Sequence, residues 1–549
     1  MADRITDLKI ICSGGLDSNR NYLDLSDRHP GIATNLVNFE PSLFGGYRRM
    51  SGFTELDATY PDVDDTLAEG KILGVVIYND EIYAMRKLQS GTTYAVYKYD
   101  SGSGWTAQTT GLTHNTTSGG NTVNRINWLI YNFGDGDRLA WVDGVNNATL
   151  FDGTNWTQID PGGTGADFAN AGGGNALEAP KYIGLLFGHL FMSGDSTSPG
   201  VVAHSSPSRD YDWLTANGSG QLIPGFTTGN LKAWRDELYI FGTTDISKVY
   251  VTSSNTFALK DVTKNIGTVA QDAILEVAGD LIYLSRDGIR SIAGTDRIGD
   301  TEIETLSKRI QEDIRDLIAT FNSDDITAVQ VNSKTQARFF LATSSVDVTD
   351  SQGIIGGIRP GSDPGMGQHL GNEPLRWEWG KIRGIRCSVV CQGLINNQEY
   401  IIHGDHDGKV YRQEQGNNYN GANITAVYST PYLDFGSPTY RKKLRKVDLF
   451  LRPEGLVELD VNLSYDWGAP NKVNPATYRF TNEAGDTSQF GDGSEYDDGS
   501  IYGSARFSVL KGNVEGTFES VQLTISTTDM QPSYSVQALI FEVTPTGRR

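Results

Sequence analysis

The sequence predicts an all-β chain: a β-propeller of about seven blades, one inserted helix and a C-terminal β-sandwich or barrel. Three observations predict it. Aromatic strands recur at a near-even interval, glycine is frequent at 63 residues while proline is low at 18, and the strand pattern changes near residue 421. With 549 residues the chain is too long for one ordinary core. We expect an N-terminal arm with the first strands at 1–56, the propeller at 57–420 and the sandwich at 421–549.

The propeller prediction comes from repetition. The segments Lys98–Thr106 and Leu150–Thr157 both read as a strand, an Asp/Gly turn and a strand that opens with Trp-Thr. Short strands of a second kind recur between such turns, each marked by one large apolar residue: Tyr83, Trp141, Phe191, Tyr239, Tyr283, Phe340 and Ile401. These markers lie 44 to 61 residues apart, the interval of a four-stranded blade of ~40–50 residues plus insertions. Seven blades are expected, and six or eight also fit the spacing.

Residues 301–318 break this pattern, because apolar side chains recur there at helical spacing with charges between them. They predict an amphipathic helix near 301–320, inserted between two blades. Packing against the side of the propeller is the plainer interpretation, and docking on a neighbouring subunit is the alternative. The apolar residues are Ile303, Leu306, Ile310, Ile314, Leu317 and Ile318.

From about Gly421 the strands alternate with period two, which favours a separate sandwich or barrel of ~120 residues. The expected strands are 424–435, 444–451, 457–467, 518–526 and 534–543, with a Gly- and Asp-rich stretch at 483–502.

The charge balance limits the function classes. The chain has 46 basic and 67 acidic residues and a net charge of −21. A protein that grips nucleic acid needs basic surface to neutralise phosphates, so gripping DNA is not expected. The same charge suits a protein past which DNA slides without sticking.

Cysteine usage and hydropathy favour a soluble cytosolic product. Cys387 and Cys391 share an expected strand, where residues four apart lie roughly 13 Å from each other, beyond the ~7 Å limit for a disulfide. They and Cys12 are expected as reduced core residues. The first residues lack the apolar core of a signal peptide. The longest apolar stretch, 182–192, is too short to span a bilayer.

Candidate sites for metal and catalysis have plainer structural interpretations. Two acidic stretches, 57–69 and 483–498, contain no lysine or arginine, but the first lacks the glycine that a calcium loop needs. The segment His403-Gly-Asp-His-Asp-Gly408 predicts a hairpin turn. In Trp377-Glu-Trp379, strand alternation puts the glutamate opposite both tryptophans, unlike a sugar-cleaving site. With no hydrolase or phosphate-binding motif in the sequence, we expect no enzyme, metal or cofactor.

A basic stretch stands out in this acidic chain. It consists of Arg441, Lys442, Lys443, Arg445 and Lys446. Contact with an acidic face of a neighbouring subunit is one interpretation. A solvated strand edge is the other.

Four N-terminal motifs carry a family resemblance: Gly14-Gly-Leu-Asp17, Pro30-Gly-Ile-Ala33, Asn35-Leu-Val-Asn-Phe39 and Gly45-Gly-Tyr-Arg-Arg-Met-Ser-Gly-Phe53. They resemble the opening of short-tailed bacteriophage tail proteins, variously called tail nozzle, tail tubular protein B, tail hub or stabilisation protein. Tyr432–Lys442 resembles the start of their C-terminal β domain. Ser51 stands where that family usually has proline.

The resemblance implies a structural virion protein of the tail, assembled in the host cytoplasm. Such proteins form a homo-oligomeric ring, typically a hexamer, that conducts genomic DNA and contacts adaptor, fibre or spike proteins. Tyr47, Arg48 and Arg49 then join the basic stretch as a candidate subunit interface. The acidic loops become candidates for the lumen or mouth of the ring, through Asp62, Asp64, Asp65, Asp492, Glu495, Asp497 and Asp498.

Two alternatives stay open. A glycan-degrading propeller enzyme of a phage tail would cluster carboxylates at one mouth of the propeller. A receptor-recognising tail protein would expose aromatic side chains on one face.

Overall fold

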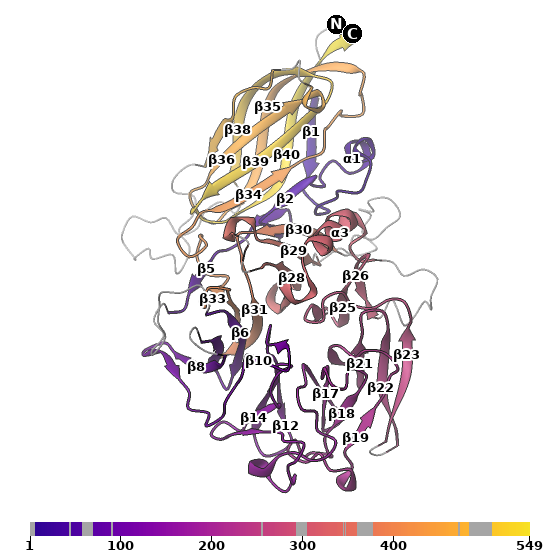
Figure 1. The fold of residues 1–549 in the computed structure, drawn as a ribbon. Coiled ribbons are helices and arrows are strands. Elements are labelled where there is room, and N and C mark those ends of the chain that lie inside the picture. Colours follow the sequence, from indigo (N-terminus) through magenta and orange to yellow (C-terminus); the bar gives the residue numbers. More distant parts are fainter. Residues whose placement is uncertain are drawn as a thin grey trace.

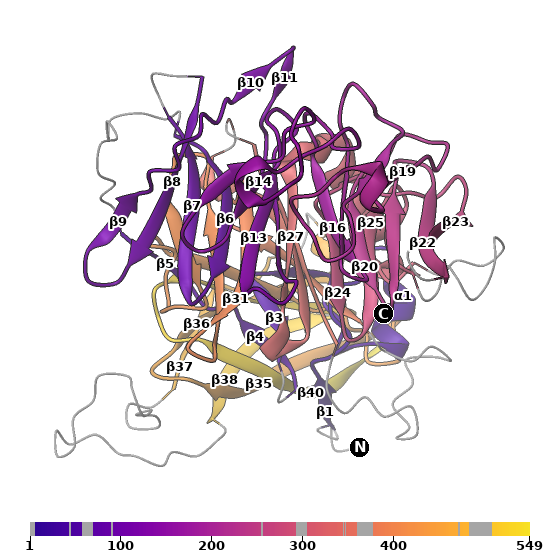
Figure 2. The ribbon, with the colours of Figure 1, turned by 90° about the horizontal axis from the view of Figure 1, so that it is seen from below.

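Short strands joined by tight turns build most of the chain. The computed structural model describes residues 6–42, 45–57, 70–88, 92–253, 256–292, 305–343, 345, 347–358, 377–469, 473–482 and 508–548. In Figure 1 small sheets form a ring around a common axis, and a two-sheet sandwich stands beside the ring. Figure 2 shows the same ring from below, with its strands running alongside one another.

The sheets of the ring follow one another along the chain and are antiparallel. Sheet by sheet, the strands are β6 (Ile72–Tyr78), β7 (Glu81–Lys87), β8 (Tyr94–Asp100) and β9 (Gly104–Ala107); β12 (Asn127–Asn132), β13 (Asp137–Val142), β14 (Thr149–Phe151) and β15 (Trp156–Gln158); β16 (Tyr182–Leu186), β17 (His189–Ser193), β18 (Val202–His204) and β19 (Gly220–Leu222); β20 (Leu231–Trp234), β21 (Glu237–Phe241), β22 (Ile246–Ser253) and β23 (Thr256–Thr263); β24 (Ile274–Val277), β25 (Asp280–Ser285) and β26 (Gly288–Ser291); β27 (Ile326–Val331), β28 (Gln336–Leu341), β29 (Gln352–Gly357) and β30 (Glu378–Arg383); and β31 (Val389–Ile395), β32 (Gln398–Gly404), β33 (Val410–Gln413) and β5 (Phe53–Glu55). A small hairpin, β10 (Thr117–Ser118) and β11 (Asn121–Thr122), projects from the ring.

The first strand of each sheet lies next to the first strands of neighbouring sheets. β6 contacts β12, β12 contacts β16, β16 contacts β20, β24 contacts β27, β27 contacts β31, and β31 returns to β6. Every apolar marker is buried in the second strand of its sheet: Tyr83 in β7, Trp141 in β13, Phe191 in β17, Tyr239 in β21, Tyr283 in β25, Phe340 in β28 and Ile401 in β32. The prediction of an all-β propeller is confirmed at this level.

The last sheet is completed from the N-terminal end of the chain. β5 pairs with β33, with Glu55 opposite Tyr411 and Phe53 opposite Gln413. The Phe53 ring stacks on Tyr419 at 4.9 Å. A strand from residues 53–55 therefore closes the ring, a pairing that the sequence did not indicate.

Two further sheets pack face to face as the sandwich. One contains β3 (Phe39–Pro41), β4 (Tyr47–Arg49), β40 (Tyr534–Arg548), β35 (Tyr440–Pro453) and β38 (Ser508–Phe518), with β1 (Thr6–Ile11) also paired to β40; the other contains β34 (Ile424–Ser429), β39 (Val521–Asp529), β36 (Glu458–Tyr465) and β37 (Tyr478–Thr481). Apolar side chains of both sheets share one buried cluster. Tyr465 stacks on Phe518 across it, with ring centroids 5.6 Å apart.

A single short strand joins the propeller to the sandwich. β2 (Asn35–Val37) lies parallel to β30 and antiparallel to β34, so β27–β30 and the second sandwich sheet form one nine-stranded sheet. The N-terminal residues thus contribute strands to both parts.

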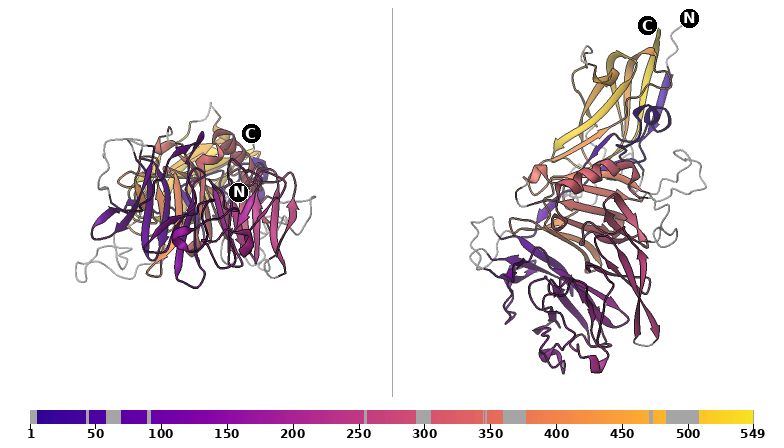
Figure 3. Two further views of the ribbon diagram at one scale, coloured as in Figure 1. Left: turned by 60° about the horizontal axis from the view of Figure 1, so that its bottom comes forward. Right: turned by 45° about the vertical axis from the view of Figure 1, so that its right-hand side comes forward.

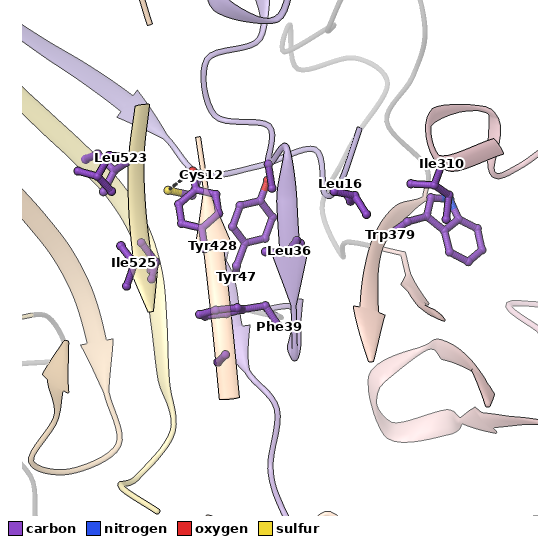
Figure 4. Packing of buried hydrophobic residues seen from close by; sticks show 14 of the residues in the cluster. Cys12, Leu16, Leu36, Phe39, Tyr47, Ile310, Trp379, Tyr428, Leu523 and Ile525 are labelled. Carbon is purple, nitrogen blue, oxygen red and sulfur yellow. Dashed lines mark hydrogen bonds between the residues drawn. The ribbon is translucent and has the colours of Figure 1, made fainter. Parts of the chain in front are cut away.

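The glycines of the first N-terminal motif permit a close backbone contact at this joint. Gly14 and Gly15 have φ of 101° and 69°, a region that costs side-chain-bearing residues energy. The Leu16 N–H donates to the carbonyl of Trp379 at 2.7 Å. A Cβ on Gly15 would lie 2.5 Å from Trp379 N. Figure 4 shows Leu16, Trp379 and the Tyr47–Tyr428–Cys12 group in the core beside this contact.

The predicted helix is present but begins later than expected. A 3₁₀ turn (Lys308–Ile310) leads into α3 (Gln311–Thr320), and residues 301–304 lie outside the described part. Ile310, Ile314 and Leu317 are buried in the cluster that also holds the sandwich core. Figure 3 shows α3 on the side of the ring that faces the sandwich. Among the described residues, further helical elements include α1 (Tyr22–Arg28) and the 3₁₀ turns Phe168–Asn170, Thr215–Asn217, Ser323–Asp325, Asn332–Lys334, Val348–Asp350 and Asp466–Gly468.

Candidate functional site

Polar side chains gather at the propeller axis, where the first strands of the sheets begin. We call this group the axial cluster; it contains Lys71, Asn124, Arg125, Lys181, Asp272, Asp324 and Ser388. Each stands one to three residues before the first strand of a sheet. Because those strands surround the axis, residues far apart in sequence meet there.

Arg125 is the centre of the axial cluster and is 5% exposed. Its Nη1 donates to Asp272 Oδ2 at 2.8 Å and to the Ile326 carbonyl at 3.0 Å. Its Nη2 donates to the carbonyls of Asp324 at 3.2 Å and Ser388 at 2.9 Å, and Nε donates to Ser388 at 3.1 Å. A guanidinium has five N–H donors, and all five are used here. Arg125 therefore ties together the starts of four sheets.

The neighbours of Arg125 extend this network around the axis. Asp324 accepts from Asn124 Nδ2 at 2.8 Å and from Lys181 Nζ at 3.3 Å. The Ser388 hydroxyl donates to the Ile72 carbonyl at 2.9 Å. Burial, and next the charge of Arg125, lower the pKa of Lys71 to about 8. The axial cluster thus links the starts of the sheets at this end of the axis, while Asp272 Oδ1 is buried without a hydrogen-bond partner among the described residues.

The segment 403–408 forms the predicted turn between β32 and β33. Asp405 Oδ1 accepts from the backbone N–H groups of Asp407 at 2.9 Å and Lys409 at 2.8 Å. Burial raises the pKa of Asp405 to about 6 and lowers that of His406 to about 4. Across the described ranges, no group of His, Cys, Asp and Glu side chains has a geometry that could hold a metal ion.

The Trp377–Trp379 segment has the predicted alternation. The two indoles stack with centroids 5.2 Å apart, and Glu378 is 2% exposed. Its Oε1 accepts from the Gly14 N–H at 3.0 Å. Glu378 therefore belongs to the contact between β30 and the N-terminal segment.

The basic stretch lies on β35 and does not share one environment. Lys442 is 5% exposed, and its Nζ donates to the carbonyls of Ser437 at 2.6 Å and Glu519 at 2.9 Å. Its assignment to a subunit interface is corrected, because strand alternation turns this side chain into the chain's own interior. Lys443 and Arg445 are exposed.

The other basic residues of this stretch make contacts within the chain. Arg441 Nε lies 4.0 Å from Glu519 Oε1, and Lys446 Nζ lies 3.0 Å from Asp448 Oδ2. Arg445 Nε donates to Thr544 Oγ1 at 2.8 Å. The surface that this stretch offers to a partner is therefore centred on Lys443 and Arg445.

Tyr47, Arg48 and Arg49 make their contacts inside the chain. Tyr47 is fully buried, and its hydroxyl donates to the Gly31 carbonyl at 2.9 Å. Arg49 is also fully buried and lies 2.9 Å from Asp529 Oδ1. The interface expectation is corrected for Tyr47 and Arg49, which are buried in the chain's own interior, whereas it stays a prediction for Arg48, whose side chain is 20% exposed.

The remaining predicted residues divide between buried and undescribed positions. Cys12, Cys387 and Cys391 are buried thiols, as expected, and burial raises the pKa of Cys391 to about 12. The acidic candidates of both loops lie outside the described residues: Asp62, Asp64, Asp65, Asp492, Glu495, Asp497 and Asp498.

Sequence reasoning missed the axial cluster. Its members are single polar residues placed before short apolar strands, with no fixed spacing between them. The available indication was positional, because such residues stand just before the first strands β6, β12, β16, β24, β27 and β31.

Comparison with known proteins leaves the family open. No protein-family model matches the chain, and no curated protein matches it. An ancestral GH74 enzyme is 11% identical with a TM-score of 0.38, over 71% of this chain and 51% of that one. The extracellular domain of a one-component system from Bacteroides thetaiotaomicron is 10% identical with a TM-score of 0.35, over 70% of this chain and 46% of that one. An arabinoxylan arabinofuranohydrolase of glycoside hydrolase family 43 from Bacillus subtilis is 10% identical with a TM-score of 0.23, over 90% of this chain and 99% of that one.

This chain thus spans about half the length of the first two proteins. At such TM-scores these likenesses carry no argument about this chain.

Within the described ranges, none of the helices combines the length and apolar character needed to cross a membrane.

Proposed function

We propose that the chain is a structural protein of a phage tail, one subunit of a ring that conducts genomic DNA during ejection and joins the tail adaptor to fibres or spikes. The observation that carries the proposal is the role of the N-terminal segment. The motifs that resemble the tail-nozzle family lie in the strands and loops that join propeller and sandwich. A subunit built as one rigid piece can tile a closed ring through heterologous contacts.

The proposal includes a blade number and a path for DNA. We infer that the successive sheets are seven blades, the last closed by β5. Arg125 and Asp272, each 7% exposed at the side chain, form an ion pair where the first strands of the sheets begin. DNA would therefore pass between subunits, in a lumen enclosed by a ring such as a hexamer.

Charge supports this path. A net charge of −21 per subunit favours an acidic lumen that repels phosphates and holds the duplex away from the wall. In this role the protein acts without enzymatic turnover and without a cofactor.

Co-expression with adaptor and fibre proteins tests the assignment. Electron microscopy of the purified assembly should show a closed ring with a central opening wide enough for duplex DNA. A chain that stays monomeric and binds neither neighbour would overturn it.

One observation favours a second candidate, a receptor-binding tail protein. Trp467 is 47% exposed and lies 4.7 Å from Tyr432 and 6.0 Å from Tyr22 between ring centroids. Exposed aromatic side chains on one face are what this alternative predicts. Host-surface polysaccharide should then bind the parent and lose binding with Trp467→Ala. Release of reducing ends from that polysaccharide would instead favour a glycan-degrading protein.

A further inference from the structure

Six charged side chains meet where the propeller, the N-terminal hairpin and the sandwich join. Three are cations and three are anions: Arg48, Lys334 and Arg338, and Glu40, Glu414 and Glu454. We call this group the junction network. Its members come from β3, β4, β28, the turn before β28, the residue after β33 and the residue after β35.

Glu40 is the acceptor that connects the parts. It is 1% exposed and accepts from Lys334 Nζ at 2.7 Å, Arg48 Nη1 at 2.9 Å and Arg338 Nη2 at 3.2 Å. Lys334 and Arg338 belong to the propeller, while Glu40 and Arg48 belong to the β3–β4 hairpin of the sandwich. One carboxylate thus receives hydrogen bonds from both parts.

The network extends outward from Glu40 on two sides. Arg48 donates to Glu454 through Nε at 2.6 Å and Nη2 at 2.8 Å. On the other side, Glu414 accepts from Lys334 Nζ at 2.6 Å and also pairs with Arg338. Arg338 is 1% exposed. The three cations balance the three anions, and Arg338 and Glu40 are the buried pair among them, so loss of either leaves an uncompensated buried charge.

The backbone junction alone is thin. Between β2 and β30 one residue pair is in register, Val37 with Lys381. The Asn38 N–H donates to the Lys381 carbonyl at 2.8 Å, and the Arg383 N–H donates to Asn38 Oδ1 at 2.9 Å. The Leu16 N–H adds a bond to the Trp379 carbonyl, and one buried apolar cluster continues from β30 and α3 into the sandwich, so the junction network acts in addition to this packing.

We infer that the junction network is an electrostatic lock that fixes the sandwich at one angle to the propeller, with Glu40 as its central acceptor. The lock does not depend on the proposed function, since it is a property of the isolated chain. Without the junction network, the contact between propeller and sandwich should open more readily, while the propeller and the sandwich themselves keep their stability.

Hydrogen exchange followed by mass spectrometry tests the lock on the full chain. In Glu40→Gln, peptides covering residues 35–50 and 378–383 should exchange at least about tenfold faster. The free energy lost when a buried ion pair is broken is larger than the free energy that corresponds to a tenfold change in exchange rate. Peptides covering β13 and β36 should keep the parent rates. Glu458→Gln is the control, because its pair with Arg479 is exposed and outside the junction.

A second variant separates lost charge balance from lost packing. Glu40→Gln combined with Arg338→Met leaves Arg48 with Glu454 and Lys334 with Glu414, so its junction peptides should exchange more slowly than those of Glu40→Gln. If Glu40→Gln does not fold, Glu414→Gln takes its place, because the Glu414 side chain is 22% exposed. Parent rates at the junction, or equal acceleration in all peptides, would overturn the lock.

Discussion

Burial sets the charge state of the histidines. The pKa of each described histidine is lowered, and burial is the largest cause in every case: His29, His114, His189, His204, His403 and His406. The pKa falls to about 4 for His114, His204 and His406, and to about 3 for His403. At neutral pH these rings are uncharged members of the core.

Acid should therefore destabilise the fold through these histidines, with a partial offset from Asp405, whose pKa burial raises to about 6 so that its protonation favours the folded state. An unfolded histidine binds its proton near the ordinary value of 6.5, whereas the folded one does so near 4. Stability is thus complete above pH 6.5 and falls as pH drops toward 4, by about 1.4 kcal/mol per pH unit for each such histidine. Burial and the charge of Glu414 raise the pKa of Glu40, but Lys334, Arg48 and Arg338 together lower it below its ordinary value of 4.5. The Glu40 carboxylate therefore contributes fully to stability above pH 4.5, and this contribution is lost only as the pH falls further.

Urea unfolding at a series of pH values checks this pH dependence. The midpoint should hold between pH 8 and 7 and fall clearly by pH 5. An equal midpoint at pH 8 and pH 5 would show that the buried histidines gain their protons without cost.

Arg125 should be the most sensitive arginine of the axis. Arg125→Met removes a buried cation and leaves Asp272 uncompensated, which costs on the order of 3–5 kcal/mol of unfolding free energy. Arg441→Met is the matched control, since the Arg441 side chain is 41% exposed and surface changes stay within about 0.5 kcal/mol. Urea unfolding measures both variants. Similar losses of unfolding free energy in the two would contradict the stabilising role of Arg125 at the axis.

At the scale of single elements, β35 offers a paired test. Lys442→Glu places a negative charge where the Nζ of Lys442 now donates to three backbone carbonyls, so the variant should be destabilised by several kcal/mol, on the order of 3–5. Lys443→Glu, one residue along and exposed, should keep the parent's stability and weaken ring assembly at low salt. Thermal unfolding and sedimentation of both variants distinguish the two effects. Equal stability of the two would contradict the alternation observed in β35.

Much of the propeller could be predicted from sequence because its strands are local. Phe191 and Tyr239 illustrate this: each sits in the second strand of an antiparallel sheet whose strands pair with their sequence neighbours. Local pairing produces a regular interval along the chain. For the same reason, Trp105 and Trp156 each follow the turn between the third and fourth strands of their sheets.

The joint could not be predicted because its pairings are long-range. Val37 lies beside Lys381 and Val427, and Glu55 beside Tyr411, partners hundreds of residues away. Nothing in a three-residue strand specifies such partners. The N-terminal motifs pointed to a family, and their physical role as the joint became visible only in three dimensions.

At the scale of the whole molecule, the charge predicts weak contact with DNA. The purified chain should bind duplex DNA no more tightly than ~10⁻⁴ M at physiological salt, the weak end of non-specific binding. Fluorescence anisotropy with a labelled duplex measures this. Micromolar binding that weakens steeply with salt would reveal a basic surface that the proposed lumen should not have.

In the proposed role this chain is a ring subunit, and DNA passes through the assembled ring. An electron cryo-microscopy map of the assembled tail, containing this protein and the genome, tests this role. We expect density for the duplex on the ring axis, between subunits, with Arg125 buried in each propeller and the acidic stretches 57–69 and 483–498 toward the lumen or its mouth. A duplex threaded through a single propeller, or this chain found alone at a fibre tip with no ring, would contradict it.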